Sequence, residues 1–341
     1  MNHVLKIDEQ KVLSNIEVCR GDKQVCLMVK ANTYGLGDEA LQMLIDCGYE
    51  FFGVSTLEEA LALRALSSSI KILIVSYIDI DAIGVCLEHD ITFTVYDKEM
   101  IKHLDERAVF HLKIDTNMGR LGFQLDELEE VREMLVTKQL TPEGIFSHLA
   151  CASDYDKTKQ AIANFEYALE VFAQFNFTYI HIHNTYGSLN YDTSFDNLVR
   201  IGIGMWGYLA NQVEAQLNRK SLKPALSLDL TISHVKQYHG FISYDHLDEV
   251  DGLVLTVPLG YHDGFCRKFR GYSIADVGVV VGNVNMCQHM ILQTSETVYH
   301  RGDLYNLFNG ANLYDLCAYG EITTYEFLVS LSPRIKRTIV K

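Results

Sequence analysis

The chain has 341 residues, a mass of 38.7 kDa, 48% hydrophobic residues and 21% charged residues. This length exceeds one average domain but suits one large barrel followed by a smaller unit. The formal net charge of -15 and the lack of a lysine- and arginine-rich run argue against nucleic-acid binding, which needs a basic face.

Cysteine usage and the start of the chain predict a cytoplasmic protein. The eight cysteines are scattered, form no CxxC pair and have no zinc-type spacing with histidine, so we expect reduced thiols and no metal site. The first residues, MNHVLKIDEQK, lack the apolar core of a secretory signal. No apolar run is long enough to predict a membrane-spanning helix.

Short apolar runs alternate with helix-like stretches over the first two-thirds of the chain. Such alternation predicts parallel strands joined by right-handed crossovers. Eight units in about 230 residues favour a TIM-type (β/α)8 barrel, with an open doubly wound sheet as the alternative. The predicted strands are 25–31, 51–56, 70–77, 91–97, 109–115, 143–149, 179–184 and 198–207. The predicted helices are 38–47, 57–66, 125–136 and 157–175.

After residue 228 the pattern changes. Segments of β character are separated by Gly, Asp and Asn instead of helices, which indicates a mostly antiparallel domain. We therefore expect a barrel over residues 1–228 and a C-terminal β domain over residues 229–341. The β-like segments are 226–238, 253–260, 274–293 and 304–309.

Lys30 is the most informative residue at a predicted strand end. Functional groups of such barrels lie at the carboxyl ends of the strands. A lysine that closes an apolar strand is costly unless it has a function or an exit to solvent. A desolvated lysine has a lowered pKa and can form a Schiff base, whereas a lysine that only snorkels at the barrel rim is the alternative.

The last predicted barrel strand carries Arg200 and a glycine-rich end. Gly202 and Gly204, on either side of Ile203, let the backbone approach a ligand. Loops after strands seven and eight commonly bind phosphate, although glycine-rich strand ends are common. Histidines at strand ends are expected to be structural, with metal binding as the alternative. A lysine with a phosphate site suggests a Schiff-base aldolase or a pyridoxal 5′-phosphate (PLP) enzyme. The other strand-end candidates are Lys113, Arg120, His148, His181, His183 and Asn184.

Eight segments resemble motifs of the alanine racemase family and occur in the family order between about residues 4 and 337. Eight motifs in order are far more specific than any one of them. The resemblance implies an N-terminal barrel, a C-terminal β domain and a head-to-tail homodimer with shared active sites. The segments are VKANTYGLG, LKIDTNMGRLGF, FSHLACA, HIHNT, VRIGIGMWGY, VPLGYHDGF, GNVNMCQ and TTYEFL.

The resemblance also implies racemisation by two bases. Lys30 would hold PLP and act as one base, while Tyr261 of the partner subunit would act on the opposite face of Cα. Two opposed bases suit a reaction that removes a proton from one face and returns it to the other. Arg200 would hydrogen-bond the ring nitrogen, and His148 would support Arg200 and Tyr261.

Further roles follow from the same resemblance. The phosphate would be bound by Tyr34, Thr185, Tyr325 and the backbone N–H groups of Gly202 and Ile203, with Asn184 in the same cofactor-binding set. Arg120 and the backbone of Met286 would meet the substrate carboxylate. Lys113 resembles a lysine that is carbamylated in many members and would then orient Arg120; an ordinary Lys–Asp pair is the alternative.

Three departures from the family pattern gather near the expected substrate mouth. His262 replaces a small residue, Cys287 replaces an aspartate, and Asn285 stands where a small residue is frequent. They leave open whether the preferred substrate is alanine, serine or another amino acid. A PLP-binding protein without turnover is a further alternative, against which the second domain and Tyr261 argue.

Overall fold

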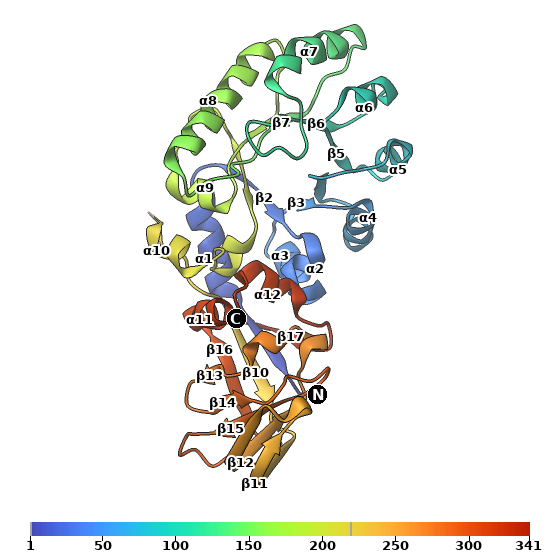
Figure 1. The fold of residues 1–341 in the computed structure, drawn as a ribbon. Coiled ribbons are helices and arrows are strands. Elements are labelled where there is room, and N and C mark those ends of the chain that lie inside the picture. Colours follow the sequence, from blue (N-terminus) through green and yellow to red (C-terminus); the bar gives the residue numbers. More distant parts are fainter. Residues whose placement is uncertain (1, 219) are drawn as a thin grey trace.

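An eight-stranded parallel sheet curls into a barrel in the computed structural model, which describes residues 2–218 and 220–341 (Figure 1). The strand order is β8-β7-β6-β5-β4-β3-β2-β9. The Asn197 N–H donates to the Ile180 carbonyl at 3.0 Å, which links the two end strands and nearly closes the barrel. The strands are β2 (Gln24–Met28), β3 (Phe51–Val54), β4 (Lys71–Ile74), β5 (Thr92–Val95), β6 (Phe110–Lys113), β7 (Gly144–Phe146), β8 (Tyr179–His181) and β9 (Leu198–Ile201).

Helices connect successive strands and lie on the outside of the barrel (Figure 1). Their starts follow local capping chemistry, because the side chains of Thr56, Asp97 and Asp154 accept backbone N–H groups at the beginnings of three helices. The predicted (β/α)8 barrel is therefore confirmed. The helices are α1 (Glu9–Arg20), α2 (Lys30–Tyr34), α3 (Gly37–Asp46), α4 (Leu57–Leu66), α5 (Ile83–Glu88), α6 (Lys98–His103), α7 (Leu128–Thr137), α8 (Tyr155–Val171), α9 (Thr185–Asn190) and α10 (Gln212–Leu217).

Two sheets form the second part of the structure, below the barrel in Figure 1. One is antiparallel with the order β11-β12-β15-β14-β13, and the other has the order β16-β10-β1-β17. The predicted mostly antiparallel β domain is confirmed. Its strands are β10 (Leu226–Thr231), β11 (His234–Ile242), β12 (Asp248–Val257), β13 (Ser273–Ile274), β14 (Gly278–Val281), β15 (His289–Gln293), β16 (Leu304–Asn309) and β17 (Lys336–Val340).

The two ends of the chain meet in the four-stranded sheet. Strand β1 (Val4–Asp8) pairs in parallel with β17 and antiparallel with β10. Leu5 and Ile7 of β1 are fully buried in an apolar core that continues from the β domain into the barrel. Strand β1, which lies before residue 228 in the sequence, therefore belongs to a sheet of the β domain and not to the barrel sheet.

Two helices interrupt the β domain, and sequence periodicity did not indicate them. They are α11 (Leu313–Tyr319) and α12 (Thr324–Ser330). A capping box starts α12, because the Thr323 hydroxyl accepts the Glu326 N–H while the Glu326 carboxylate accepts the Thr323 N–H. The segment TTYEFL contains this capping pattern. Helix α12 places Tyr325 against the barrel, with its ring centroid 6.1 Å from that of Tyr34.

Candidate active site

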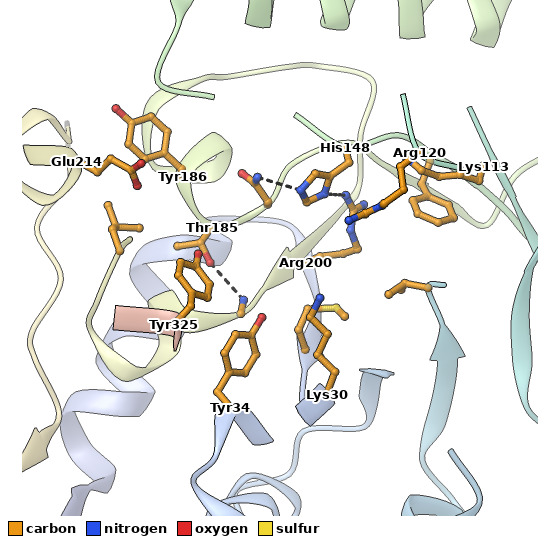
Figure 2. A pocket seen from close by; sticks show the side chains of 16 residues that line it. Lys30, Tyr34, Lys113, Arg120, His148, Thr185, Tyr186, Arg200, Glu214 and Tyr325 are labelled. Carbon is orange, nitrogen blue, oxygen red and sulfur yellow. Dashed lines mark hydrogen bonds between the residues drawn. The ribbon is translucent and has the colours of Figure 1, made fainter. Parts of the chain in front are cut away.

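A cavity of about 310 Å³ opens among the residues that follow the barrel strands, where α12 also reaches it (Figure 2). Residues from the carboxyl ends of several strands converge on it, as the barrel predicts. Most of the predicted site residues line it together. They are Lys30, Tyr34, Lys113, Arg120, His148, Asn184, Thr185, Arg200, Gly202 and Tyr325.

Lys30 does not close a strand, which corrects the prediction. Strand β2 ends at Met28, because the backbone turns left-handed directly after Lys30. The four residues 31–34 have φ values between 53° and 58°, a conformation that costs an L-residue roughly 1–2 kcal/mol. The Ala31 N–H donates to the Glu59 carboxylate at 2.6 Å and holds this turn. The turn directs both Lys30 and Tyr34 into the cavity (Figure 2).

The ammonium group of Lys30 lies in an unfavourable electrostatic environment. Burial lowers the pKa of Lys30, Arg120 and Arg200 lower it further, and Glu59 acts in the opposite direction. A lysine with a lowered pKa carries a neutral, nucleophilic amine more often than a surface lysine does. Lys30 is thus prepared for covalent or base chemistry.

Arg200 is buried beneath the cavity and hydrogen-bonded on several sides. Its Nη1 donates to His181 Nδ1 at 2.5 Å, and its Nη2 donates to the Ser147 carbonyl at 2.7 Å. The His148 Nδ1 lies 3.4 Å from Nη2, and the Asn184 Nδ2 lies 3.5 Å from the other ring nitrogen of His148. Burial lowers the pKa of Arg200 to about 10, so the guanidinium remains charged at neutral pH.

A glycine-lined cradle lies beside Arg200. A Cβ on Gly202 would lie 2.2 Å from the Tyr34 hydroxyl, and a Cβ on Gly204 would lie 2.2 Å from Thr185 Cγ2. Only glycine therefore lets these side chains reach the backbone. The Gly202 N–H donates to the Thr185 hydroxyl at 3.2 Å. Ile203 starts the short helix η3 (Ile203–Trp206) directly after Gly202.

Lys113 is a second buried cation of the cavity. Its Nζ is 3.4 Å from the Ile114 carbonyl and 4.9 Å from the centre of the Phe146 ring. Burial first and then Arg200 hold the pKa of Lys113 well below its ordinary value. The Asp115 carboxylate accepts backbone N–H groups, including that of Arg120 at 3.0 Å.

Tyr261 and Met286 lie outside the cavity formed by their own chain. Tyr261 is 41% exposed and Met286 is 58% exposed. The Tyr261 N–H donates to the Asn285 carbonyl at 3.1 Å, and the His262 N–H donates to the Met286 carbonyl at 3.0 Å. Residues 260–264 and 285–287 thus form one surface unit, the Tyr261 turn.

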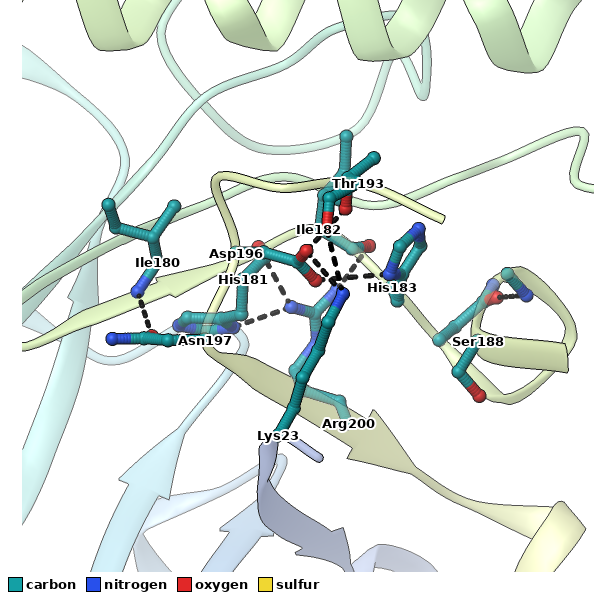
Figure 3. A network of polar contacts seen from close by, with 12 residues as sticks. Lys23, Ile180, His181, Ile182, His183, Ser188, Thr193, Asp196, Asn197 and Arg200 are labelled. Carbon is teal, nitrogen blue, oxygen red and sulfur yellow. Dashed lines mark hydrogen bonds and ion pairs between the residues drawn. The ribbon is translucent and has the colours of Figure 1, made fainter. Parts of the chain in front are cut away.

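The histidines at the end of β8 have structural partners. His181 contacts Arg200, and His183 Nδ1 lies 3.0 Å from the Asp196 carboxylate, which also binds Lys23 at 2.5 Å (Figure 3). Within residues 2–218 and 220–341, no group of three or more His, Cys, Asp or Glu side chains could hold a metal ion.

Three polar or aromatic residues of the cavity were missed by sequence reasoning. Phe146 and Tyr186 lie next to predicted positions in their motifs, and this proximity was the available signal. Glu214 of α10 also lines the cavity, and burial raises the pKa of its carboxyl group. No motif marked Glu214. Among the described residues, no helix is both long and apolar enough to cross a membrane.

Comparisons with known proteins cover both parts of the chain. Residues 7–210 match the family model of the alanine racemase N-terminal domain, and residues 225–339 match that of the C-terminal domain. The alanine racemase of Staphylococcus saprophyticus is 34% identical over 310 residues, which cover 84% of this chain and 80% of that protein. The chain therefore belongs to the alanine racemase family.

Solved structures agree with this assignment. The crystal structure of alanine racemase from E. faecalis is 29% identical, with a TM-score of 0.89 and coverage of 98% of this chain and 97% of that one. A histidine racemase from Leuconostoc mesenteroides is 24% identical, with a TM-score of 0.88 and coverage of 100% and 98%. The second likeness shows the shared fold alone.

Proposed function

We propose that the protein is a PLP-dependent racemase that interconverts L- and D-alanine. The observation that carries this proposal is the convergence of Lys30, Arg200 and the glycine-lined cradle in one cavity. Family membership supports the same reaction. The barrel over residues 1–228 would hold the cofactor, and the β domain over residues 229–341 would supply the second base.

The cavity fits the charges and shape of PLP. The cradle can receive a phosphate through the N–H groups of Gly202 and Ile203 and the hydroxyls of Tyr34, Thr185 and Tyr325. Burial raises the pKa of Tyr34 and Tyr325, so both hydroxyls keep the protons that they would donate. When bound, PLP supplies an electron sink that makes the Cα–H of an amino acid acidic.

Arg200 would face the ring nitrogen of the cofactor. A guanidinium is a donor only and keeps its proton at neutral pH, so it does not protonate that nitrogen. The weaker electron sink limits charge accumulation and thereby disfavours side reactions such as transamination. His148 would keep Arg200 in place from the cavity side, where burial and Arg200 hold the pKa of His148 well below its ordinary value.

Two bases would act from different subunits. Lys30 lies in the cavity of its own chain, whereas Tyr261 is exposed on the β domain and would enter the cavity of a second copy. We therefore propose a homodimer with shared sites. Arg120 and the backbone of Met286 of the partner subunit would bind the substrate carboxylate.

Lys113 would support Arg120 as a carbamate. Its lowered pKa leaves an uncharged amine, which is the form that reacts with carbon dioxide. The resulting anion would stand between cationic neighbours and orient Arg120. We place the reaction in the cytoplasm, in keeping with the reduced thiols expected from the sequence.

A chiral assay with PLP and purified protein tests the proposal. We expect L-alanine and D-alanine to interconvert, and Lys30→Ala to abolish this while Lys98→Ala, a surface substitution, leaves it unchanged. Full activity of Lys30→Ala would contradict the assigned mechanism. Borohydride trapping should attach PLP, and not a substrate, to Lys30, which separates a racemase from an aldolase.

A different preferred amino acid is the second candidate. His262, Asn285 and Cys287 belong to the Tyr261 turn, so they would surround the substrate mouth together. One structural relative is named histidine racemase, which shows that this fold carries other racemases. Comparing kcat/KM over a panel of L-amino acids would decide between alanine, serine and histidine.

A further inference from the structure

A line of buried polar side chains runs from Arg200 through the barrel interior to the opposite mouth. Arg200 Nη1 lies 2.5 Å from His181 Nδ1, and His181 Nε2 lies 2.8 Å from His111 Nδ1. His111 Nε2 lies 3.4 Å from a carboxylate oxygen of Glu143, whose other oxygen binds Lys71 at 2.5 Å. Glu143 and Lys71 stand at the starts of β7 and β4, away from the cavity.

The space for this line is built into the backbone. A Cβ on Gly144 would lie 2.8 Å from ring atoms of His111, so a glycine at this position leaves room for the imidazole. His111 and His181 are both fully buried. Their ring nitrogens therefore depend on partners inside the protein.

The chemistry of the two ends determines the direction of every hydrogen bond. Arg200 can only donate, so His181 Nδ1 must be bare and its proton must lie on Nε2. That proton is donated to His111 Nδ1, so His111 also carries its proton on Nε2. The Glu143 carboxylate can only accept, and one of its oxygens lies 3.4 Å from the His111 nitrogen that carries this proton. Both ends thus require the same pair of tautomers.

We propose that Glu143 is a positioning residue for Arg200, acting through His111 and His181 from the amino-terminal end of the barrel. A hydrogen-bond donor in place of the Glu143 carboxylate would permit every hydrogen bond along the line to run in the opposite direction. His181 would then present an N–H to the Arg200 N–H at a separation that only a hydrogen bond tolerates. The guanidinium would have to move away from its place beneath the cavity.

The charges along the line agree with neutral histidines. Burial first lowers the pKa of His111 and holds that of His181 well below its ordinary value. Burial alone would raise the pKa of Glu143, but the neighbouring His111 and Lys71 hold it below its ordinary value. Glu143 is therefore a carboxylate at neutral pH and can serve as the terminal acceptor.

The significance of Arg200 for the cofactor rests on the proposed function, but the tautomers do not. They can be read by NMR of the PLP-loaded protein with 15N-labelled histidine, because N–H and bare ring nitrogens have well-separated shifts. We expect bare Nδ1 and protonated Nε2 in both rings, assigned through His111→Gln and His181→Gln. An Nδ1–H tautomer or a doubly protonated ring at either position would overturn the proposal, whatever the racemase activity.

Matched variants test the action at a distance. Glu143→Gln should move the Nε2–H signals of both histidines upfield, because a neutral acceptor makes a weaker hydrogen bond. It should also lower kcat severalfold with little change in KM. Glu50→Gln is the control, since Glu50 lies at the same mouth and it is its backbone carbonyl that accepts the Lys71 N–H.

Lys71→Met should shift the same signals in the opposite direction, and it can be measured even if Glu143→Gln folds poorly. It keeps the carboxylate but removes its ammonium partner, so both Nε2–H signals should move downfield. A change confined to His111, with the His181 signal and the absorption spectrum of the bound cofactor unchanged, would show that Glu143 does not reach Arg200.

Discussion

Arg200 and Tyr261 represent opposite ways of presenting a functional group within one chain. Arg200 is 5% exposed, and its guanidinium donates to His181, Ser147 and neighbouring carbonyls. Tyr261 is 41% exposed, and its own chain holds it mainly through the backbone of a turn. The partners that hold Arg200 all belong to its own chain. Tyr261, in contrast, would act only in the cavity of a second copy.

Substitution of Tyr261 tests this difference between the two residues, and it has the largest expected effect, a fall in kcat. Tyr261→Phe removes the proposed second base but keeps the ring, so we expect kcat for alanine to fall by about 10²- to 10⁴-fold. Cofactor affinity should stay close to that of the wild type, because the side chains proposed to bind the phosphate line the cavity of one chain and that of Tyr261 is not among them. The measurements are the chiral assay and a PLP titration.

Mixed dimers show which chain supplies Tyr261. A heterodimer of one Lys30→Ala chain and one Tyr261→Phe chain would contain one intact site of two. Random association makes about half of the dimers heterodimers, so about a quarter of wild-type activity should return. Two inactive variants that stay inactive after unfolding and refolding together would contradict the shared site. A fully active monomer would do the same.

His289 connects the exposed Tyr261 turn to a buried support. Its Nδ1 lies 2.8 Å from the Leu259 carbonyl, and burial lowers the pKa of His289 from 6.5 to about 4. Between these pH values the unfolded chain binds a proton that the folded protein does not bind. The free energy of unfolding should therefore fall with falling pH, by at most about 3 kcal/mol from this group.

Denaturant titrations at pH 6.5 and pH 4.5 measure this contribution. His289→Gln should lessen the loss of stability on acidification, and His239→Gln, an exposed substitution in β11, should not. An unchanged pH dependence in His289→Gln would mean that other groups account for the acid sensitivity.

Gly202→Ala tests the rigidity of the barrel half. The new methyl group would meet the Tyr34 hydroxyl at 2.2 Å, and such overpacking typically costs about 2 kcal/mol. We expect PLP to bind roughly 30-fold more weakly, as measured by equilibrium dialysis. Gly84→Ala in α5, where a Cβ has open space, is the control. Equal affinities in both variants would argue that the cradle adapts.

Asp263→Asn addresses the base of the Tyr261 turn and has the smallest expected effect. Asp263 is buried, accepts the Gly260 N–H at 3.1 Å and pairs with Arg334 at 2.5 Å. The amide keeps the first contact and loses the charge, so the free energy of unfolding should fall by about 1.5 kcal/mol. Glu321→Gln, which breaks an exposed pair with Lys268, should change stability far less. Loss of PLP affinity in Asp263→Asn would contradict the separation of the two halves.

Much of the architecture was predictable because it rests on local patterns. The helix predicted over 57–66 coincides with α4, and each predicted barrel strand overlaps an observed one. The candidate residues came from strand ends and family motifs, and most of them meet in the cavity. Strand lengths were overestimated, since apolar character continues past the strand ends to buried residues such as Val29 and Ile203.

Other features had no local signal. Ala31, Thr33 and Tyr34 avoid the left-handed region in most contexts, so VKANTYGLG did not predict the four-residue turn that directs Lys30 into the cavity. The pairing of β1 with β17 joins the two ends of the chain. Glu143 looks like an ordinary residue before a strand, and only the closed barrel brings it to His111.

By itself the sequence determined the alternation of strands and helices, the family and the set of candidate side chains, because periodicity and motifs are properties of neighbouring residues. Tertiary structure alone decided that Arg200 lies in a buried line of hydrogen bonds, that Tyr325 closes on Tyr34, and that Tyr261 faces away from its own cavity. These outcomes depend on burial and on contacts between distant segments, which arise only when the barrel and the β domain pack together.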